Sequence, residues 1–207
     1  MTLKEFLKIE LQMVVIGLAA AAVVALALPF KAHAATGQVL PEVKRTRAAL
    51  YLEASDVPAF IERQGGSGRI LFLDVRTRAE AMYVGMADRV DALVPFVEHQ
   101  ELMTDGDAQR SSYRLEPMQD FVPEVQRRLN EKNLSKDDVV VLICRSGDRS
   151  SRGANRLTDA GFGRVYSVVD GFEGDMSAEG RRNVNGWKNA GLPWGYKLEQ
   201  HKMFFAR

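Results

Sequence analysis

The sequence predicts an α/β protein, built on a small parallel sheet flanked by helices on both faces and carrying polar insertions. Three segments have the near-continuous apolar character of parallel strands that are buried on both faces. Helical patterns lie between them, and strands that alternate with helices favour a parallel sheet. The three strand segments are 69–75, 138–143 and 164–169.

Residues 1–34 have the features of an export signal. Two lysines precede an apolar stretch at 13–30, and Ala32-His33-Ala34 has the small-residue pattern of a cleavage site. We therefore expect a signal peptide cut after Ala34, with the remaining chain exported or periplasmic. The alternative is an uncleaved membrane anchor at 13–30, because this stretch approaches the ~17–25 residues that a spanning helix needs. A membrane contact is expected only in that second case.

Charge and cysteine content exclude several classes of partner and site. The chain has 207 residues, with 28 Lys+Arg against 27 Asp+Glu. This balance gives no reason to expect nucleic acid as a partner. A single cysteine excludes an intramolecular disulfide, and with three histidines it leaves too few ligands for a usual Cys/His zinc site. No metal and no cofactor is therefore expected.

One globular domain is expected at 48–199, after a polar lead-in at 35–47 and before a C-terminal tail at 200–207. Its first helix begins at Ser55, because the following Asp and Pro suit a first helical turn, and a run of glycines at 65–68 ends it. The other elements expected in this half are short strands at 48–52 and 92–97, the buried strand at 69–75 and a short helix at 78–82.

The segment 98–117 is polar and has few apolar anchors. A loop of this length is uncommon in a compact domain unless it is functional or disordered. We expect a solvated insertion with a hairpin around Asp105-Gly106. The alternative is a lid over a site or a loop that docks a protein partner.

Regular structure resumes at Asp120. The apolar stripe of an amphipathic helix is formed there by Phe121, Val122, Val125 and Leu129. The remaining elements are the strand at 138–143, a helix at 150–160 that Gly161 ends, and the strand at 164–169, which Asp170-Gly171 ends.

Cys144 is the candidate nucleophile. It follows the carboxyl end of a buried strand, where ligands of open α/β sheets bind, and a short polar turn leads from it into a helix. The backbone N–H groups of such a turn and the helix dipole stabilise a thiolate, which is the reactive form of cysteine. His99 lies in the polar loop and His201 in the tail, so the sequence does not support a Cys–His pair.

Four segments resemble motifs of the rhodanese (sulfurtransferase) family and occur in the family's order. The most specific is Cys144-Arg145-Ser146-Gly147-Asp148-Arg149-Ser150, which is similar to the C-R-S-G-x-R-S active-site loop. The other three are Leu73-Asp74-Val75-Arg76, similar to a strand-end D-V-R; Asp170-Gly171-Phe172-Glu173-Gly174, similar to a glycine turn; and Gly186 to Pro193, similar to the closing W-k-x-a-G-L-P. The resemblance implies a single-domain rhodanese-like protein with a small parallel sheet, and the N-terminal segment makes it an exported form.

The resemblance also implies persulfide chemistry at Cys144. A sulfane sulfur would pass from a small anionic donor such as thiosulfate to Cys144, and then to cyanide or a thiol. The N–H groups of the loop would hold the charge of the outer sulfur. Arg149, and also Arg145, would attract the donor or brace the loop. Asp74 would support the loop by pairing with one of its arginines, and Arg76 would serve either purpose.

Two other functions are set against this one. Related cysteine phosphatases have arginine six positions after cysteine, whereas Arg149 follows Cys144 by five, so the smaller ring suits a sulfur atom better than phosphate. The second alternative is a binding or accessory module of a periplasmic system with little or no turnover. The carboxylate of Asp148 in the donor's approach and the insertions at 98–117 and 175–185 motivate this reading, with 98–117 as the surface for a protein partner.

Overall fold

The computed structural model describes residues 40–100, 102–109 and 111–205. The predicted signal peptide or anchor at 1–34 lies outside the described residues. The core of the fold is a parallel five-stranded sheet in the order β1-β10-β9-β2-β4, which confirms the predicted α/β class. The strands are β1 (Tyr51–Leu52), β2 (Ile70–Asp74), β4 (Ala92–Leu93), β9 (Val139–Ile143) and β10 (Arg164–Val168). Within the described part of the chain, no helix is long and apolar enough to cross a membrane.

The central strands β2 and β9 are apolar except for Asp74 at the end of β2, because both of their faces are buried. All five residues of β2 and all five of β9 are buried, and alternate residues enter two separate clusters. Ile70 and Phe72 belong to one cluster, whereas Leu71 and Leu73 belong to the other. This is the period of two expected of a strand, and it explains why the sequence reads as a continuous apolar run.

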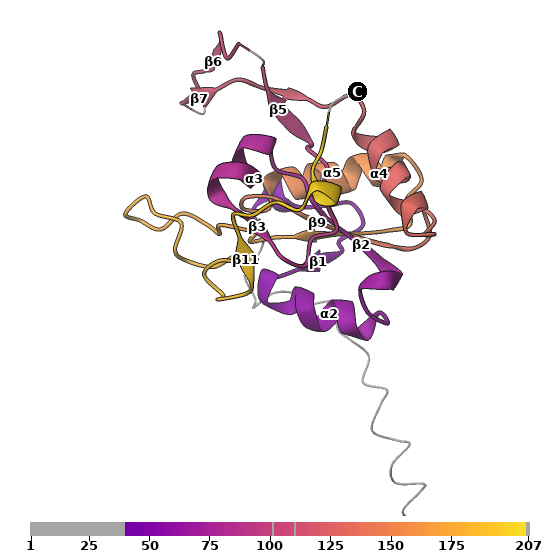
Figure 1. Cartoon of the computed structure of the whole chain (residues 1–207). Coiled ribbons are helices and arrows are strands. Elements are labelled where there is room, and N and C mark those ends of the chain that lie inside the picture. Colours follow the sequence, from indigo (N-terminus) through magenta and orange to yellow (C-terminus); the bar gives the residue numbers. More distant parts are fainter. Residues whose placement is uncertain (1–39, 101, 110, 206–207) are drawn as a thin grey trace, which may run out of the picture. The chain divides into compact units, whose positions relative to one another are not determined.

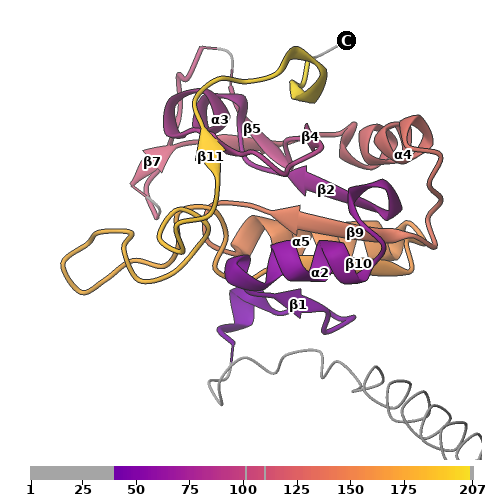
Figure 2. The same ribbon diagram turned by 60° about the horizontal axis from the view of Figure 1, so that its bottom comes forward.

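Helices cover both faces of the sheet (Figures 1 and 2). On one face, α2 (Val57–Arg63) packs its Phe60 and Ile61 into the first cluster. On the other face lie α4 (Phe121–Glu131) and α5 (Asp148–Asp159). Burial of each large apolar side chain of α4, such as Phe121 and Leu129, contributes about 1.5–3 kcal/mol. The remaining helix, α3 (Arg78–Val84), follows β2.

Several predicted boundaries differ from the structure. The strand expected at 48–52 is only β1 (Tyr51–Leu52), and the helix expected at 78–82 extends to Val84. The helix expected from Ser55 begins as a 3-10 turn, η3 (Ala54–Asp56), and α5 starts two residues before the predicted Ser150. The single strand predicted at 92–97 is wrong, because the chain forms β4 and then β5 (Val97–His99), which leaves the main sheet. Pro95 lies between them, and proline has no N–H to donate to a sheet.

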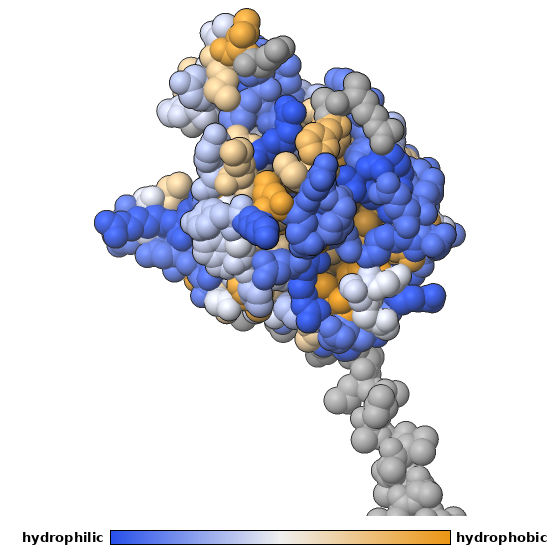
Figure 3. Space-filling model, in the orientation of Figure 1, coloured by the Kyte–Doolittle hydropathy of each residue, from blue (hydrophilic) through white to orange (hydrophobic). Residues whose placement is uncertain are grey.

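The insertion at 98–117 is a two-level antiparallel arm. At its base, β5 pairs with β8 (Leu115–Pro117), and further out β6 (Gly106–Asp107) pairs with β7 (Ser112–Tyr113). The predicted hairpin is confirmed, although its turn follows Asp107. In Figure 1 this arm projects from the sheet, and Figure 3 shows hydrophobic surface at its tip. Leu102 and Tyr113 are exposed on it.

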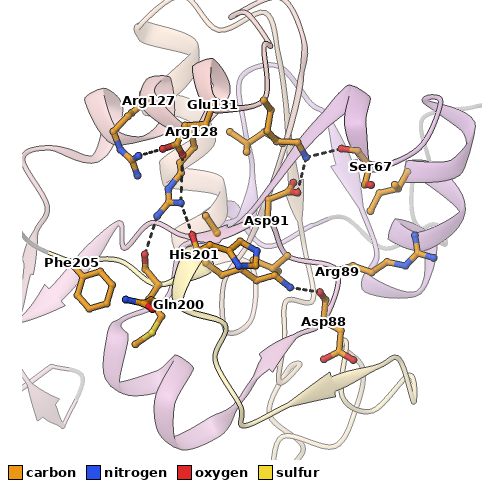
Figure 4. A pocket seen from close by; sticks show the side chains of 17 residues that line it. Ser67, Asp88, Arg89, Asp91, Arg127, Arg128, Glu131, Gln200, His201 and Phe205 are labelled. Atoms are coloured by element: carbon orange, nitrogen blue, oxygen red, sulfur yellow. Dashed lines mark hydrogen bonds and ion pairs between the residues drawn. The ribbon is translucent and has the colours of Figure 1, made fainter.

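The C-terminal residues pack on the edge of the sheet. A short strand, β11 (Trp194–Gly195), pairs with β3 (Met86–Ala87), and the chain then passes α4. Arg128 of α4 donates to the carbonyls of His201 (2.8 Å) and Met203 (2.9 Å), and Phe204 is buried. The tail and α4 line a partly open pocket of about 780 Å³. Its side chains are drawn in Figure 4.

Candidate active site

The loop after β9 places Cys144 at the centre of the sheet's carboxyl edge. β9 lies between β2 and β10, so the residue after its last position, Ile143, meets the ends of both neighbours. Cys144 is followed by three residues and then by α5, which begins at Asp148. The Cys144 side chain is only 1% exposed, yet it lines a cleft. The predicted strand–turn–helix setting of the cysteine is therefore confirmed.

Gly147 gives the loop its curvature. Its φ of 100° and ψ of −20° lie in the left-handed region, which favours glycine. A Cβ at this position would come within 2.1 Å of the Val169 carbonyl oxygen. In this conformation the Gly147 N–H donates to Cys144 Sγ at 3.2 Å. The loop thus places a backbone donor on the sulfur, as a site for an anionic sulfur requires.

The glycine turn after β10 holds the carbonyl groups of the loop. The N–H of Phe172 donates to the Cys144 carbonyl at 2.8 Å, and the N–H of Glu173 donates to the Arg145 carbonyl at 3.0 Å. Gly171, with φ of 68°, approaches so closely that an added Cβ would meet those carbonyls at 2.5–2.6 Å. The N–H groups of this turn thus satisfy the backbone carbonyls of Cys144 and Arg145 and fix the start of the active-site loop.

Two serine hydroxyls form a chain behind the sulfur. Cys144 Sγ lies 3.5 Å from Ser150 Oγ, and Ser150 Oγ lies 2.9 Å from Ser167 Oγ. Both serines are fully buried, so these hydroxyls take their partners from the protein. When Cys144 is a thiolate, Ser150 can turn its O–H toward the sulfur while it accepts from Ser167. Ser167 was not among the predicted site residues. The sequence does show a serine within the otherwise largely apolar strand at 164–169, and this serine could have indicated a polar contact.

Arg149 is paired with Glu80. Its two terminal nitrogens donate to the two carboxylate oxygens of Glu80, each at 2.6 Å, and both side chains are largely buried. Burial alone would raise the pKa of Glu80, but the hydrogen bonds and charge of Arg149 outweigh it and lower that pKa to about 2. Arg149 therefore braces the loop against α3. Glu80 was missed, although Thr77 and Glu80 form a capping box that the sequence displays.

The predicted partner of Asp74, an arginine of the active-site loop, is wrong. Asp74 pairs with Arg76 at 2.6 Å, not with an arginine of the active-site loop. The two side chains are two positions apart at the end of β2, where extended chain directs them to the same side. Arg76 also donates to the Gly85 carbonyl at 2.7 Å and stacks on the Phe172 ring at 4.0 Å. Both side chains have 0% exposure, so this pair supports the fold beneath the loop.

Both insertions line the cleft above Cys144. The cleft has a volume of about 1410 Å³ and includes most of the 98–117 arm, along with Met176 and Arg182 of the 175–185 insertion. Arg145, Ser146, Asp148 and Arg149 of the active-site loop line it as well. The structure thus brings the predicted loop and the two insertions together at one site, which agrees with the alternative that 98–117 lies over a site.

The second cavity, at the C-terminal tail, contains no cysteine among its lining residues. Its basic side chains have partners: Lys132 pairs with Asp91 at 2.6 Å, and Lys202 donates to the Asp88 carbonyl at 2.9 Å (Figure 4). Across residues 40–100, 102–109 and 111–205, no group of three or more histidine, cysteine and acidic residues is arranged to hold a metal ion. The chemistry of the described site is therefore that of a cysteine surrounded by N–H, hydroxyl and guanidinium donors.

Comparisons with known proteins agree with this geometry. The model of the family described as "Rhodanese-like domain" matches residues 57–178. The chain is 31% identical over 124 residues to the uncharacterized protein RP600 homolog of Rickettsia rickettsii, which covers 60% of this chain and 81% of that protein. An uncharacterized protein of Rickettsia conorii is 30% identical over the same shares. The crystal structure of Rv0390 from M. tuberculosis has a TM-score of 0.50 and 29% identity, covering 71% of this chain and 97% of that chain.

Proposed function

The chain belongs to the rhodanese-like domain family, and from this membership we propose that it is a sulfurtransferase that works through a persulfide on Cys144. The donor is a small sulfane-sulfur anion such as thiosulfate, and the acceptor is cyanide or a thiol. The observation that carries the proposal is the Gly147 N–H on Cys144 Sγ, at the centre of a loop whose carbonyls are held by the next turn. Its predicted location outside the cytosol remains part of this proposal.

The proposed reaction has two balanced steps. The Cys144 thiolate attacks the outer sulfur of thiosulfate, a new S–S bond forms, the S–S bond of thiosulfate breaks, and sulfite leaves with both negative charges. Cyanide then attacks the outer sulfur of the persulfide, which breaks the new S–S bond and yields thiocyanate and the Cys144 thiolate. Sulfur moves in its sulfane state in both steps, so no external oxidant or reductant takes part.

The residues around the sulfur have distinct roles in these steps. Gly147 supplies a preorganised N–H donor for the anionic sulfur, and this kind of donor needs no reorganisation during the reaction. Ser150 supplies a second donor once the cysteine is ionised. Arg149 is a positioning residue, since both its terminal nitrogens are engaged by Glu80.

Intact mass after incubation with thiosulfate tests the proposal. We expect the wild-type protein to gain one sulfur, about 32 Da, and Cys144→Ser to gain nothing while its circular dichroism stays unchanged. Oxidation to a sulfinic acid adds nearly the same mass, so a thiol reductant is the control: it reverses a persulfide and leaves a sulfinic acid in place. No reversible gain with thiosulfate, polysulfide or an organic persulfide would contradict the proposal, and so would a full gain on Cys144→Ser.

The second candidate is a binding module with little turnover, favoured by the position of the 98–117 arm along the cleft. Exposed apolar side chains such as Leu102 and Tyr113 on an arm of this kind are typical of a protein contact. In this case a stable complex with a protein partner is expected, together with negligible sulfur transfer. Replacing the β6–β7 hairpin by a short glycine-serine turn should abolish the complex, as measured by size-exclusion chromatography. A complex that survives this change would exclude the β6–β7 hairpin as the contact.

A further inference from the structure

Arg182 and Arg145 are cations in the cleft that lack an acidic partner. Both line it together with Cys144. Arg149, one of the two loop arginines that the sequence suggested for attracting the donor or bracing the loop, has its charge matched by Glu80. Among the residues that the structure describes, no carboxylate forms an ion pair within 4.0 Å of Arg145 or Arg182. Of the two loop arginines that the sequence suggested for attracting the donor, Arg145 therefore remains available to an incoming anion, and the structure adds Arg182.

Arg182 is held in place by the fold of the 175–185 insertion. Its backbone forms a β-bridge with Met176, and its side chain donates to the Gly174 carbonyl at 2.6 Å. The Asn189 side chain donates to the Arg182 carbonyl at 3.2 Å. Arg182 is half-buried, so its guanidinium is positioned before any ligand arrives. A donor group that is already positioned loses less conformational entropy on binding.

The electrostatic surroundings of Arg182 favour an anion. Burial is the largest influence that lowers the pKa of Arg182, and the positive charge of Arg145 lowers it further. Glu173 and Asp175 act in the opposite direction, but the Asp175 carboxylate is engaged by Lys44 at 2.5 Å. Two neighbouring guanidinium groups repel each other, and an anion bound between them removes that cost.

We propose that Arg182 and Arg145 bind the oxyanion group of the sulfur donor and direct its sulfane sulfur toward Cys144. The group is a sulfonate, as in thiosulfate, or a carboxylate, as in an acidic organic persulfide. Guanidinium groups bind both oxyanions through paired hydrogen bonds. This inference rests on the proposed sulfurtransferase function and adds its substrate-binding residue. The cleft of about 1410 Å³ has room for either donor.

Alkylation of Cys144 tests the anion site without sulfur transfer. Iodoacetate and iodoacetamide have nearly the same shape but differ in charge, and each forms a thioether on the thiolate with loss of iodide. We expect Arg182→Gln to lower the ratio of the iodoacetate rate to the iodoacetamide rate about tenfold, and Arg182→Lys to lower it less. The matched control is Arg181→Gln, which removes the same charge from the exposed adjacent residue outside the cleft. This control should leave the ratio nearly unchanged.

The outcomes separate the two proposals. An unchanged ratio in Arg182→Gln, or an equal fall in Arg181→Gln, would overturn the anion site even if sulfur transfer is found. A fall confined to Arg182→Gln supports the site even if wild-type protein takes up no sulfur, and in that case the proposed function fails alone. With an active protein, a rise in the thiosulfate concentration for half-maximal loading of Arg182→Gln identifies the sulfonate. An unchanged concentration identifies the carboxylate of an organic persulfide.

Discussion

Replacing Gly147 with alanine is expected to destabilise the protein by about 3–5 kcal/mol and to lower sulfur uptake at least about 100-fold. The added Cβ would lie 2.1 Å from the Val169 carbonyl oxygen, and φ of 100° is itself unfavourable for alanine. The peptide would have to rotate, and the N–H that donates to Cys144 Sγ would leave the sulfur. Denaturant unfolding and persulfide formation, measured by intact mass, test the two effects.

Gly161→Ala is the matched control for this substitution. Gly161 also has a positive φ, of 86°, but an added Cβ would find nothing within 4 Å. It should therefore show the conformational cost alone, about 1 kcal/mol, with sulfur uptake unchanged. If Gly147→Ala were no more harmful than Gly161→Ala, the loop geometry described for the Cys144 site would be wrong.

Glu80→Gln is expected to lower the free energy of unfolding by about 3–5 kcal/mol at pH 7, because it leaves the Arg149 guanidinium buried without its counter-charge. Sulfur uptake should also fall, since Arg149 joins the first turn of α5 to α3 beside the active-site loop. The matched control is Glu62→Gln, whose carboxylate pairs with Arg89 at 2.8 Å on the exposed surface. Such surface pairs contribute about 0–1 kcal/mol.

The effect of Glu80 should depend on pH in a defined direction. Its pKa is about 2 in the folded protein and near 4.5 for the unperturbed group, so the unfolded state binds the proton more readily between these values. The stabilisation by Glu80 is therefore present above pH 4.5 and is lost as the pH falls toward 2. The difference in unfolding free energy between wild type and Glu80→Gln should shrink from pH 7 to pH 3. A constant difference over this range would contradict the assigned ion pair.

The central strands and the position of the nucleophile followed from local chemistry. A parallel strand that is covered on both faces is apolar at nearly every position, so the runs at 70–73 and 139–143 were recognisable without a structure. Cys144 directly follows such a run and precedes a helix, which places it at the carboxyl edge of the sheet. The prediction of a single strand at 92–97 was wrong because the edge strand β4 has only two residues, too few to show a pattern, and Pro95 follows it closely.

Partner choice among the charged groups depended on tertiary contacts. Glu80 and Arg149 are 69 positions apart, and only the packing of α3 beside the start of α5 brings them to 2.6 Å. That contact pairs Arg149 with a carboxylate, and under our proposal the donor-binding role falls to Arg145 and Arg182. An ion pair is set by distance and burial, and residue type alone does not encode either. The amino-acid order was therefore sufficient to place Cys144 at the carboxyl edge of the sheet, whereas the folded chain decides which of the arginines around it are paired with carboxylates.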